Sequence, residues 1–221
     1  LMQFADELEK ADNFEAALSK LIRRELAAHR RILFNGNGYS EEWPLEAARR
    51  GLLNLRSTPE ALIHYTDEKN VALFARHGVY TRTEIQSRQD INMEEYAKII
   101  HIEALTLIDM LGKLIVPACA AYSGKLAEGV AAKAGIGVDA PAEAAQVRLL
   151  TEKTAELIER TERLKAVVAA EPEALNARAM YEHEAVIPAM EAARQVADEL
   201  EGRVGKEYWP MPSYADLLFY V

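Results

Sequence analysis

The residues of this sequence that could perform chemistry are its histidines, its one cysteine and its many carboxylates. Glu25 and His29 are four residues apart, and so are Glu60 and His64, which places each pair on one face of an expected helix. A di-metal centre in a helical bundle requires instead two Glu-x-x-His motifs that face one another. The sequence contains no such motif, so we expect no di-metal centre.

The other histidines favour structural roles. His101 and Glu103 are two residues apart and therefore lie on different helix faces, so we do not expect them to share a ligand. His183 falls on an apolar stripe of the last long helix, and we interpret it as a partly buried, hydrogen-bonded structural residue. The remaining three histidines, His29, His64 and His77, are each expected near the C-terminus of a helix. Positive charge is favourable at such a position.

No nucleotide-binding motif is present either. The sequence lacks a phosphate-binding loop of the G-x-x-x-x-G-K-[ST] type, and Asn35-Gly-Asn-Gly38 lacks the strand and the third glycine of a dinucleotide fingerprint. The most basic stretch, Lys20–Arg31, has the spacing of a solvated helix face. Cys119 lies in an apolar run, which is typical of a buried thiol in a reducing compartment. We therefore assign no catalytic, cofactor-binding or metal-binding residue.

Composition favours a globular protein. Half of the 221 residues are hydrophobic, and the net charge is −9. This charge disfavours nucleic acid or an anionic membrane as the main partner. No signal peptide or run of 18 apolar residues is present, so we expect a soluble, cytoplasmic protein. The sequence begins without methionine, inside an amphipathic pattern, and we expect it to be part of a longer polypeptide.

A long helix is predicted from Thr81 to Gly124. It opens with a capping box, in which the side chains of Thr81 and Glu84 satisfy free backbone N–H groups of the first turn. Apolar residues recur on two faces, so we expect the helix to be enclosed on more than one side. It would be about 63 Å long, whereas a compact domain of 221 residues is about 44 Å wide. The sequence therefore predicts an elongated bundle.

The remaining segments complete an all-α prediction. Residues 142–207 read as an antiparallel helical hairpin, with Leu157 and Leu164 on a heptad seam. Pro117 and Pro188 lie inside helical runs and should bend them. We expect short helices in residues 1–80, a helical bundle in residues 81–221, a loose connection after Gly124, and an aromatic tail after residue 207 that docks onto another surface.

Five sequence blocks, in order along the chain, resemble one family. They are Phe34-Asn-Gly-Asn-Gly-Tyr-Ser-Glu-Glu-Trp43, Arg76-His-Gly-Val-Tyr-Thr-Arg-Thr-Glu-Ile-Gln-Ser-Arg88, Ile102-Glu-Ala-Leu-Thr-Leu-Ile-Asp-Met110, Val186-Ile-Pro-Ala-Met190 with Asp198-Glu-Leu-Glu201, and Tyr208-Trp-Pro-Met-Pro-Ser-Tyr-Ala-Asp-Leu-Leu-Phe219. Together they are similar to the C-terminal region of type III glutamine synthetases.

The resemblance implies a large cytoplasmic ligase that makes glutamine from glutamate, ammonia and ATP with magnesium or manganese, assembled as stacked hexameric rings. In that family the metal-binding glutamates and substrate arginines belong to a catalytic domain that precedes this region, and none of those motifs is present here. The resemblance therefore implies a non-catalytic helical region that binds no cofactor itself. Its partners would be the catalytic domain and the other subunits of a homo-oligomer. The residues alone leave open an alternative, a free-standing helical module for protein interaction.

Overall fold

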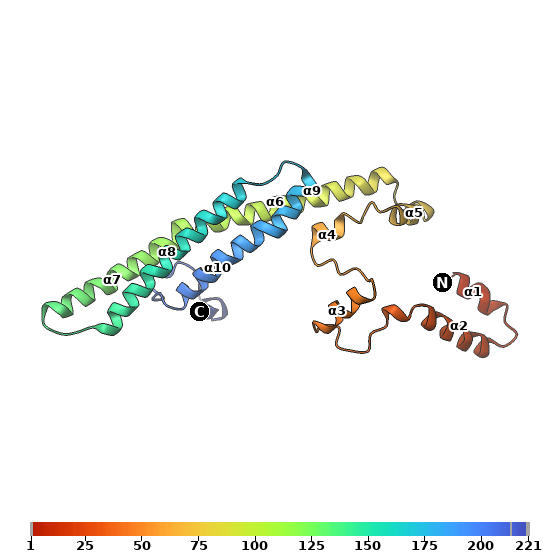
Figure 1. Cartoon of the computed structure of the whole chain (residues 1–221), viewed down its shortest axis with the longest axis horizontal. Coiled ribbons are helices and arrows are strands. Elements are labelled where there is room, and N and C mark those ends of the chain that lie inside the picture. Colours follow the sequence, from red (N-terminus) through yellow and green to blue (C-terminus); the bar gives the residue numbers. More distant parts are fainter. Residues whose placement is uncertain (1, 213, 220–221) are drawn as a thin grey trace. The chain divides into compact units, whose positions relative to one another are not determined.

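The computed structural model describes residues 2–212 and 214–219. Every regular element in these ranges is helical and none is a strand (Figure 1), which confirms the all-α prediction. The chain divides into two compact units, residues 1–56 and residues 57–221. We describe each unit by itself. None of the described helices combines the length and the apolar character needed to cross a membrane.

The first unit is made of short helices. It contains α1 (Met2–Glu9), α2 (Phe14–Ala28), the single turn η1 (Arg30–Ile32) and α3 (Glu42–Arg49). The side chain of Asn13 caps α2 by accepting the backbone N–H of Ala16 at 3.0 Å. Two hydrogen bonds of 2.9 Å from Arg24 to Glu7 join α2 to α1. The only buried apolar side chains described in this unit are those of Leu21 and Ala47, so its core is small.

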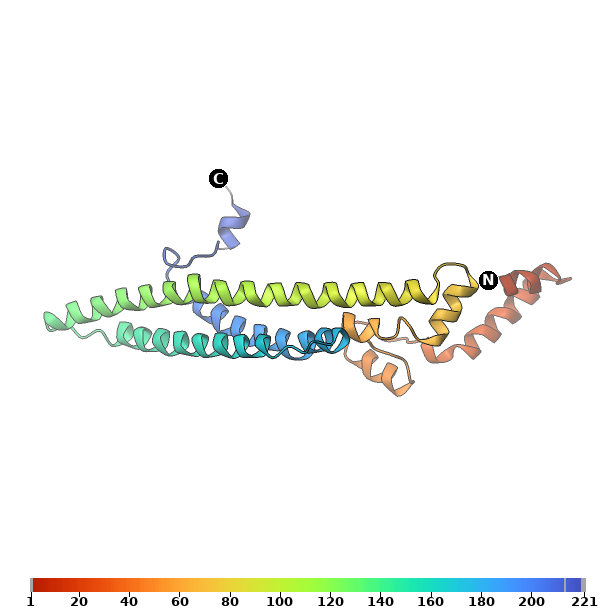
Figure 2. The same ribbon diagram turned by 90° about the horizontal axis from the view of Figure 1, so that it is seen from above.

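The second unit is built on one continuous helical rod. After α4 (Thr58–Leu62) and α5 (Glu68–Arg76), the chain runs through α6 (Arg82–Met110), η2 (Leu111–Ile115) and α7 (Val116–Gly135) (Figure 2). The predicted capping box is present at its start, because Glu84 accepts the backbone N–H of Thr81 at 2.7 Å. Both α4 and α5 contact α6, although the sequence grouped residues 57–80 with the N-terminal helices.

The rod continues past the point where the sequence predicted a loose connection. Gly124 and Gly129 both lie inside α7, and the turn comes only after Gly135. Alanine is frequent in this segment and is the strongest helix former, so it outweighs the two glycines. Contact with the following helix stabilises the segment further. Gly137 then adopts a φ of +75°, the left-handed conformation that favours glycine just after a helix.

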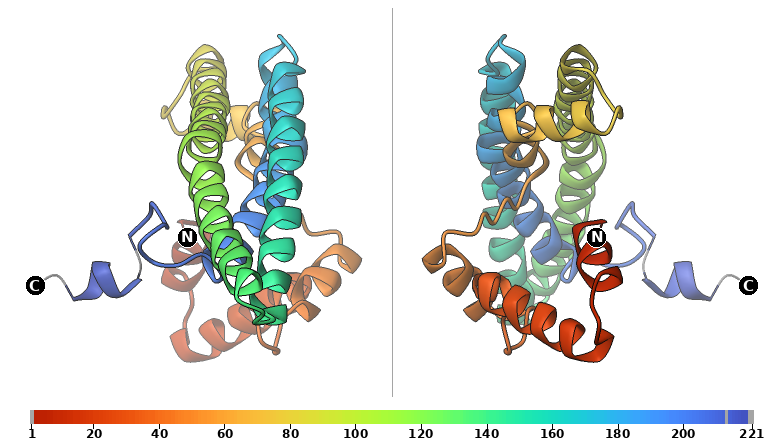
Figure 3. Two further views of the ribbon diagram at one scale, coloured as in Figure 1. Left: turned by 90° about the vertical axis from the view of Figure 1, so that its left-hand side faces the viewer. Right: turned by 90° about the vertical axis from the view of Figure 1, so that its right-hand side faces the viewer.

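A helical hairpin packs against the rod, as predicted. Its first arm is α8 (Pro141–Ala169), and its second arm is α9 (Leu175–Tyr181), η3 (Glu182–Val186) and α10 (Ile187–Glu201). Viewed end-on, the rod stands beside the two arms (Figure 3). Leu157 and Leu164 are fully buried at the seam, which confirms the predicted register. Leu157 shares a core cluster with Leu111, Cys119, Leu150 and Leu200, among other residues.

Both internal prolines follow a π-helical turn. Proline has no N–H and its ring clashes with the carbonyl four residues earlier, so the helix widens by one residue before each proline. Leu111–Ile115 forms this turn before Pro117, and Glu182–Val186 forms it before Pro188. Each turn buries its first and last residue. Leu111 and Glu182 therefore occupy equivalent places, each six residues before a proline.

The aromatic tail lies partly on the bundle. Tyr208 and Trp209 pack against the main core cluster, and the ring of Tyr208 lies 5.2 Å from that of Tyr122. The final short helix is α11 (Tyr214–Leu218), from which Asp216 accepts a hydrogen bond of 2.6 Å from Lys206. Ser213, Tyr220 and Val221, which the sequence included in the docking tail, fall outside the described residues.

Candidate functional site

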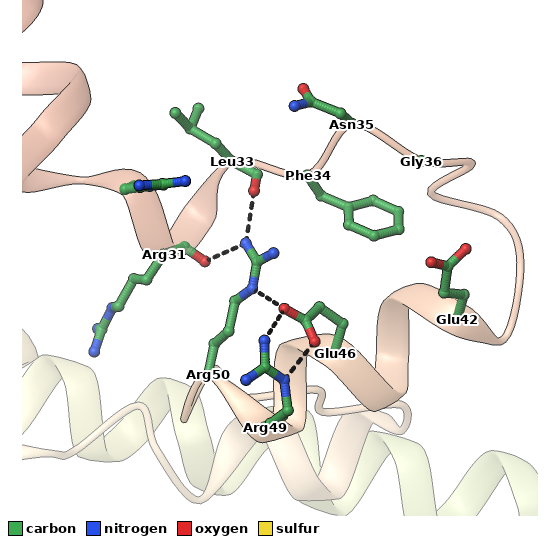
Figure 4. A pocket seen from close by; sticks show the side chains of 10 residues that line it. Arg31, Leu33, Phe34, Asn35, Gly36, Glu42, Glu46, Arg49 and Arg50 are labelled. Carbon is green, nitrogen blue, oxygen red and sulfur yellow. Dashed lines mark hydrogen bonds and ion pairs between the residues drawn. The ribbon is translucent and has the colours of Figure 1, made fainter.

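The first unit contains a pocket of about 780 Å³ with a cationic lining (Figure 4). Glu46 on α3 holds two of its arginines. Arg49 donates two hydrogen bonds of 2.6 Å to the Glu46 carboxylate, and Arg50 donates one of 2.5 Å. These hydrogen bonds lower the pKa of Glu46 to about 2, so the carboxylate stays charged at neutral pH. The single negative charge of Glu46 therefore offsets only one of the two positive charges of Arg49 and Arg50.

Arg50 also fixes the loop beside this pocket. Its Nη1 donates to the backbone carbonyl oxygens of Arg31 and Leu33, at 3.1 and 2.6 Å (Figure 4). Carbonyls at a helix end need such donors, because no further turn follows to supply them. Arg50 therefore joins α3 to the end of η1. The arrangement is a structural link within the first unit, although the side chain of Arg49 remains 74% exposed.

The second unit brings together a more reactive set of side chains, a histidine and two glutamates. His101 projects from α6, Glu171 follows the end of α8, and Glu182 begins the π-helical turn η3. The Nδ1 atom of His101 lies 2.6 Å from Oε1 of Glu171. One donor atom from each of the three residues lies within 4.8 Å of those of the other two. A residue of α6 therefore meets two residues that lie seventy or more positions later in the chain.

Glu182 is the innermost member of this cluster and is fully buried. Among the described residues, no donor group reaches either of its carboxylate oxygens. Burial raises the pKa of Glu182 to about 7, and the negative charge of Glu171 acts in the same direction. The nearby His101 and Arg178 partly oppose this rise. The carboxyl of Glu182 can therefore gain or lose its proton near neutral pH.

A small pocket connects the cluster to solvent. It has a volume of about 160 Å³. Its lining combines four charged side chains, one histidine and three aliphatic side chains. These residues are Glu94, Ala97, Lys98, His101, Ile102, Glu171, Leu175 and Arg178. The side chain of His101 is 38% exposed and that of Glu171 is 13% exposed. His101 and Glu171 thus form the floor of the pocket, and Glu182 lies behind them.

The histidines that the sequence singled out have different surroundings. His101 is not paired with Glu103, as expected, but it does have an acidic partner in Glu171, seventy residues later in the chain. His183 is half-buried, whereas the preceding Glu182 takes the fully buried position. His64 lies 3.0 Å from Asp67, and His29 lies 3.5 Å from Glu25. These two pairs are more exposed than the cluster around Glu182.

Glu171 and Glu182 were not predicted as candidate site residues. One signal for Glu182 was available, because it continues the spacing of three and four residues that links Ala179 to Val186. No comparable signal marks Glu171, which reads as an ordinary residue before a proline. Cys119 is buried, as expected, and burial raises the pKa of its thiol, which favours the unreactive protonated form.

Comparison with known proteins identifies related sequences. Residues 17–134 match the family model described as the glutamine synthetase C-terminal domain. The chain is 34% identical to a glutamine synthetase of Butyrivibrio fibrisolvens over 94% of its own length. It is 35% identical to the type-3 glutamine synthetase of Dictyostelium discoideum over 95% of its length. In both comparisons the chain spans about 30% of the length of the relative.

Proposed function

Because this chain belongs to the glutamine synthetase C-terminal domain family, we propose that it is a non-catalytic helical region of a type III glutamine synthetase. Its proposed role is mechanical: it packs against other parts of that enzyme and supports its assembly. The parent enzyme would join ammonia to glutamate at the expense of ATP, with magnesium or manganese, in the cytoplasm. It would thereby serve glutamine biosynthesis and nitrogen metabolism. The catalytic residues would belong to the rest of the parent polypeptide.

The observation that carries this proposal is an apolar face of α6 that the rest of the described chain does not cover. Four large side chains on this face are exposed: Ile91, Ile99, Ile102 and Leu105. Helical geometry places them within about one third of the circumference, opposite the buried Met93 and Ala97. The sequence predicted that this helix is enclosed on more than one side. Within the described chain, Ile102 remains 61% exposed and Leu105 48% exposed.

Exposed apolar surface of this kind marks a site of contact with another protein surface. The occupant we propose is another part of a glutamine synthetase, in the same subunit or a neighbouring one. The length of the relatives supports this choice, because about 70% of each lies outside the matched region. The exposed Leu217, Leu218 and Phe219 near the C-terminus would add a second contact. This docking would bury side chains that are unfavourable in water.

A pair of neighbouring substitutions in a full-length type III enzyme tests the assembly role. Ile91→Asp places a charge on the apolar face, whereas Asn92→Asp introduces the same carboxylate on an exposed polar position beside it. We expect Ile91→Asp to shift sedimentation velocity profiles toward smaller species. Asn92→Asp should leave the profile unchanged. Intact assembly of both Ile91→Asp and Leu105→Asp would contradict the proposal.

The non-catalytic role has a separate test. The 221-residue chain should form no glutamine from glutamate, ammonia and ATP. It should also show no tight binding of ATP with magnesium in titration calorimetry, because phosphoryl transfer needs cationic groups that converge on the phosphates. In the first unit, Arg49 and Arg50 are held by Glu46 instead. A dissociation constant of about 1 µM would reveal a nucleotide site and contradict a purely mechanical role.

A further inference from the structure

We propose that His101, Glu171 and Glu182 form a binding site for a divalent transition-metal cation of the Zn²⁺ type. The site would lie inside the helical bundle, at the floor of the small pocket between α6 and the segment that joins α8 to α9. The inference starts from the three donor atoms, which lie within 4.8 Å of one another.

The donor set fits this class of metal. Zn²⁺ binds imidazole nitrogen and carboxylate oxygen at about 2.0–2.2 Å, and sites with three protein ligands leave a further position for water. An imidazole ligand favours Zn²⁺ and its neighbours, whereas sites made of oxygen alone favour Mg²⁺ or Ca²⁺. One neutral imidazole and two carboxylates would also balance the two positive charges of the cation. The cluster can therefore supply three ligands and a neutral site.

The burial of Glu182 is the second, independent observation. A buried carboxylate without a partner is unfavourable, and it is normally paired or bound to a metal. Both of its oxygens lack a donor among the described residues, so a ligand would find them available. The equivalent position in the other π-helical turn is occupied by Leu111, which is equally buried. An apolar side chain thus fits such a turn, and glutamate is not required to form it.

The spacing of the donor atoms is compatible with a cation. Donor atoms in a tetrahedral zinc site are separated by about 3.3 Å, as follows from a bond length near 2.05 Å. The separation of 2.6 Å between His101 and Glu171 and the upper limit of 4.8 Å bracket this value. The short contact now holds a proton, and the cation would replace it. Metal binding would therefore release protons and weaken at acidic pH.

The pocket supplies access and the remaining ligand. Its volume of about 160 Å³ is larger than one water molecule requires. A cation can therefore enter from solvent past His101 and keep at least one water. The two other His–carboxylate pairs described above, His29–Glu25 and His64–Asp67, are not part of a comparable group of three in the described chain. The cluster around Glu182 is thus distinguished from them by its third, buried ligand.

Zinc titration of the 221-residue chain tests the site. The protein is first treated with a chelator and then titrated with ZnCl₂ at pH 7.5 in a calorimeter. We expect one equivalent to bind with a dissociation constant below about 10 µM. Glu182→Gln removes an anionic ligand and should weaken binding at least about tenfold. Glu184→Gln makes the same change at an exposed position of η3 and should bind zinc like the unmodified chain.

A second variant and a second metal distinguish the loss of a metal ligand from a folding defect. His101→Ala changes a partly exposed side chain, so circular dichroism should remain unchanged while zinc affinity falls at least about tenfold. Addition of CoCl₂ should give the visible absorption band of low-coordinate Co²⁺. The His101→Ala variant should not show this band. MgCl₂ in excess should not displace zinc. No zinc binding tighter than millimolar, or zinc binding by His101→Ala and Glu182→Gln as tight as that of the unmodified chain, would overturn the proposal.

Discussion

The Nδ1 atom of His101 lies 2.6 Å from Oε1 of Glu171, a residue seventy positions later in the chain. This contact joins the long helix α6 to the segment between the two arms of the helical hairpin. Directly behind it, Glu182 places a second carboxyl group in the protein interior. Among the described residues, this is the one His–Glu–Glu cluster. It lies where the rod meets both arms of the hairpin.

The buried carboxyl predicts a specific pH dependence of stability. The pKa of Glu182 rises from 4.5 in the unfolded chain to about 7 in the folded protein. Between these values the folded state binds more protons than the unfolded state, so stability falls as the pH rises. The contribution of Glu182 is fully present below pH 4.5 and is lost through pH 7. Its size is on the order of 3 kcal/mol.

Comparison with Glu182→Gln isolates this effect, because glutamine has nearly the same shape and does not titrate. We expect the difference in unfolding free energy between the unmodified chain and Glu182→Gln to decline from pH 5 to pH 8. Urea unfolding at a series of pH values measures it. The groups that face Glu182, namely Glu171, His101 and Arg178, are present in both proteins. A difference that does not vary with pH would show that Glu182 titrates normally.

Replacing the same residue by leucine should stabilise the bundle. Glu182→Leu gives η3 the side chain that Leu111 supplies in the equivalent turn, and it removes a buried ionisable group. Exchange of buried charged groups for apolar ones is often neutral or stabilising by about 1–4 kcal/mol. We therefore expect a higher melting temperature at pH 7.5. The exposed Glu184 provides the control Glu184→Leu, and a lower melting temperature for Glu182→Leu would contradict the prediction.

The register of the hairpin can be tested at two adjacent residues of α8. Leu157 is fully buried, whereas Ile158 is 45% exposed. Leu157→Ala should therefore reduce the free energy of unfolding by about 2–5 kcal/mol. Ile158→Ala should change it by no more than about 0.5 kcal/mol. Equal losses in chemical denaturation would mean that the seam does not pass through Leu157.

The capping box of α6 provides a fourth prediction. The hydroxyl of Thr81 accepts the backbone N–H of Glu84, and the Glu84 carboxylate accepts the backbone N–H of Thr81. Thr81→Ala should reduce stability by about 1 kcal/mol. Thr83→Ala, two residues later at an exposed position, removes the same hydroxyl without a cap and should cause no loss. Faster amide hydrogen exchange in the first turn of α6 should accompany Thr81→Ala alone.

The local features of the fold follow from the sequence. The capping box at Thr81, the heptad seam through Leu157 and the antiparallel hairpin all depend on residues close together in the chain. Their spacing predicts them directly. Pro117 and Pro188 were predicted to bend their helices, because a proline cannot complete the helical hydrogen-bond ladder. The form of each interruption, a π-helical turn, emerged only in the structure.

The candidate site depended on tertiary structure. His101 and Glu171 are seventy residues apart, and their contact follows from how far α6 and the hairpin overlap along their lengths. Small changes in that overlap would separate the two side chains, and no local pattern fixes it. The burial of Glu182 depends likewise on the widened turn before Pro188, which shifts the helix face that meets α6 and α8. Sequence periodicity determined the helices, whereas the packing of the hairpin against the rod determined which polar side chains meet.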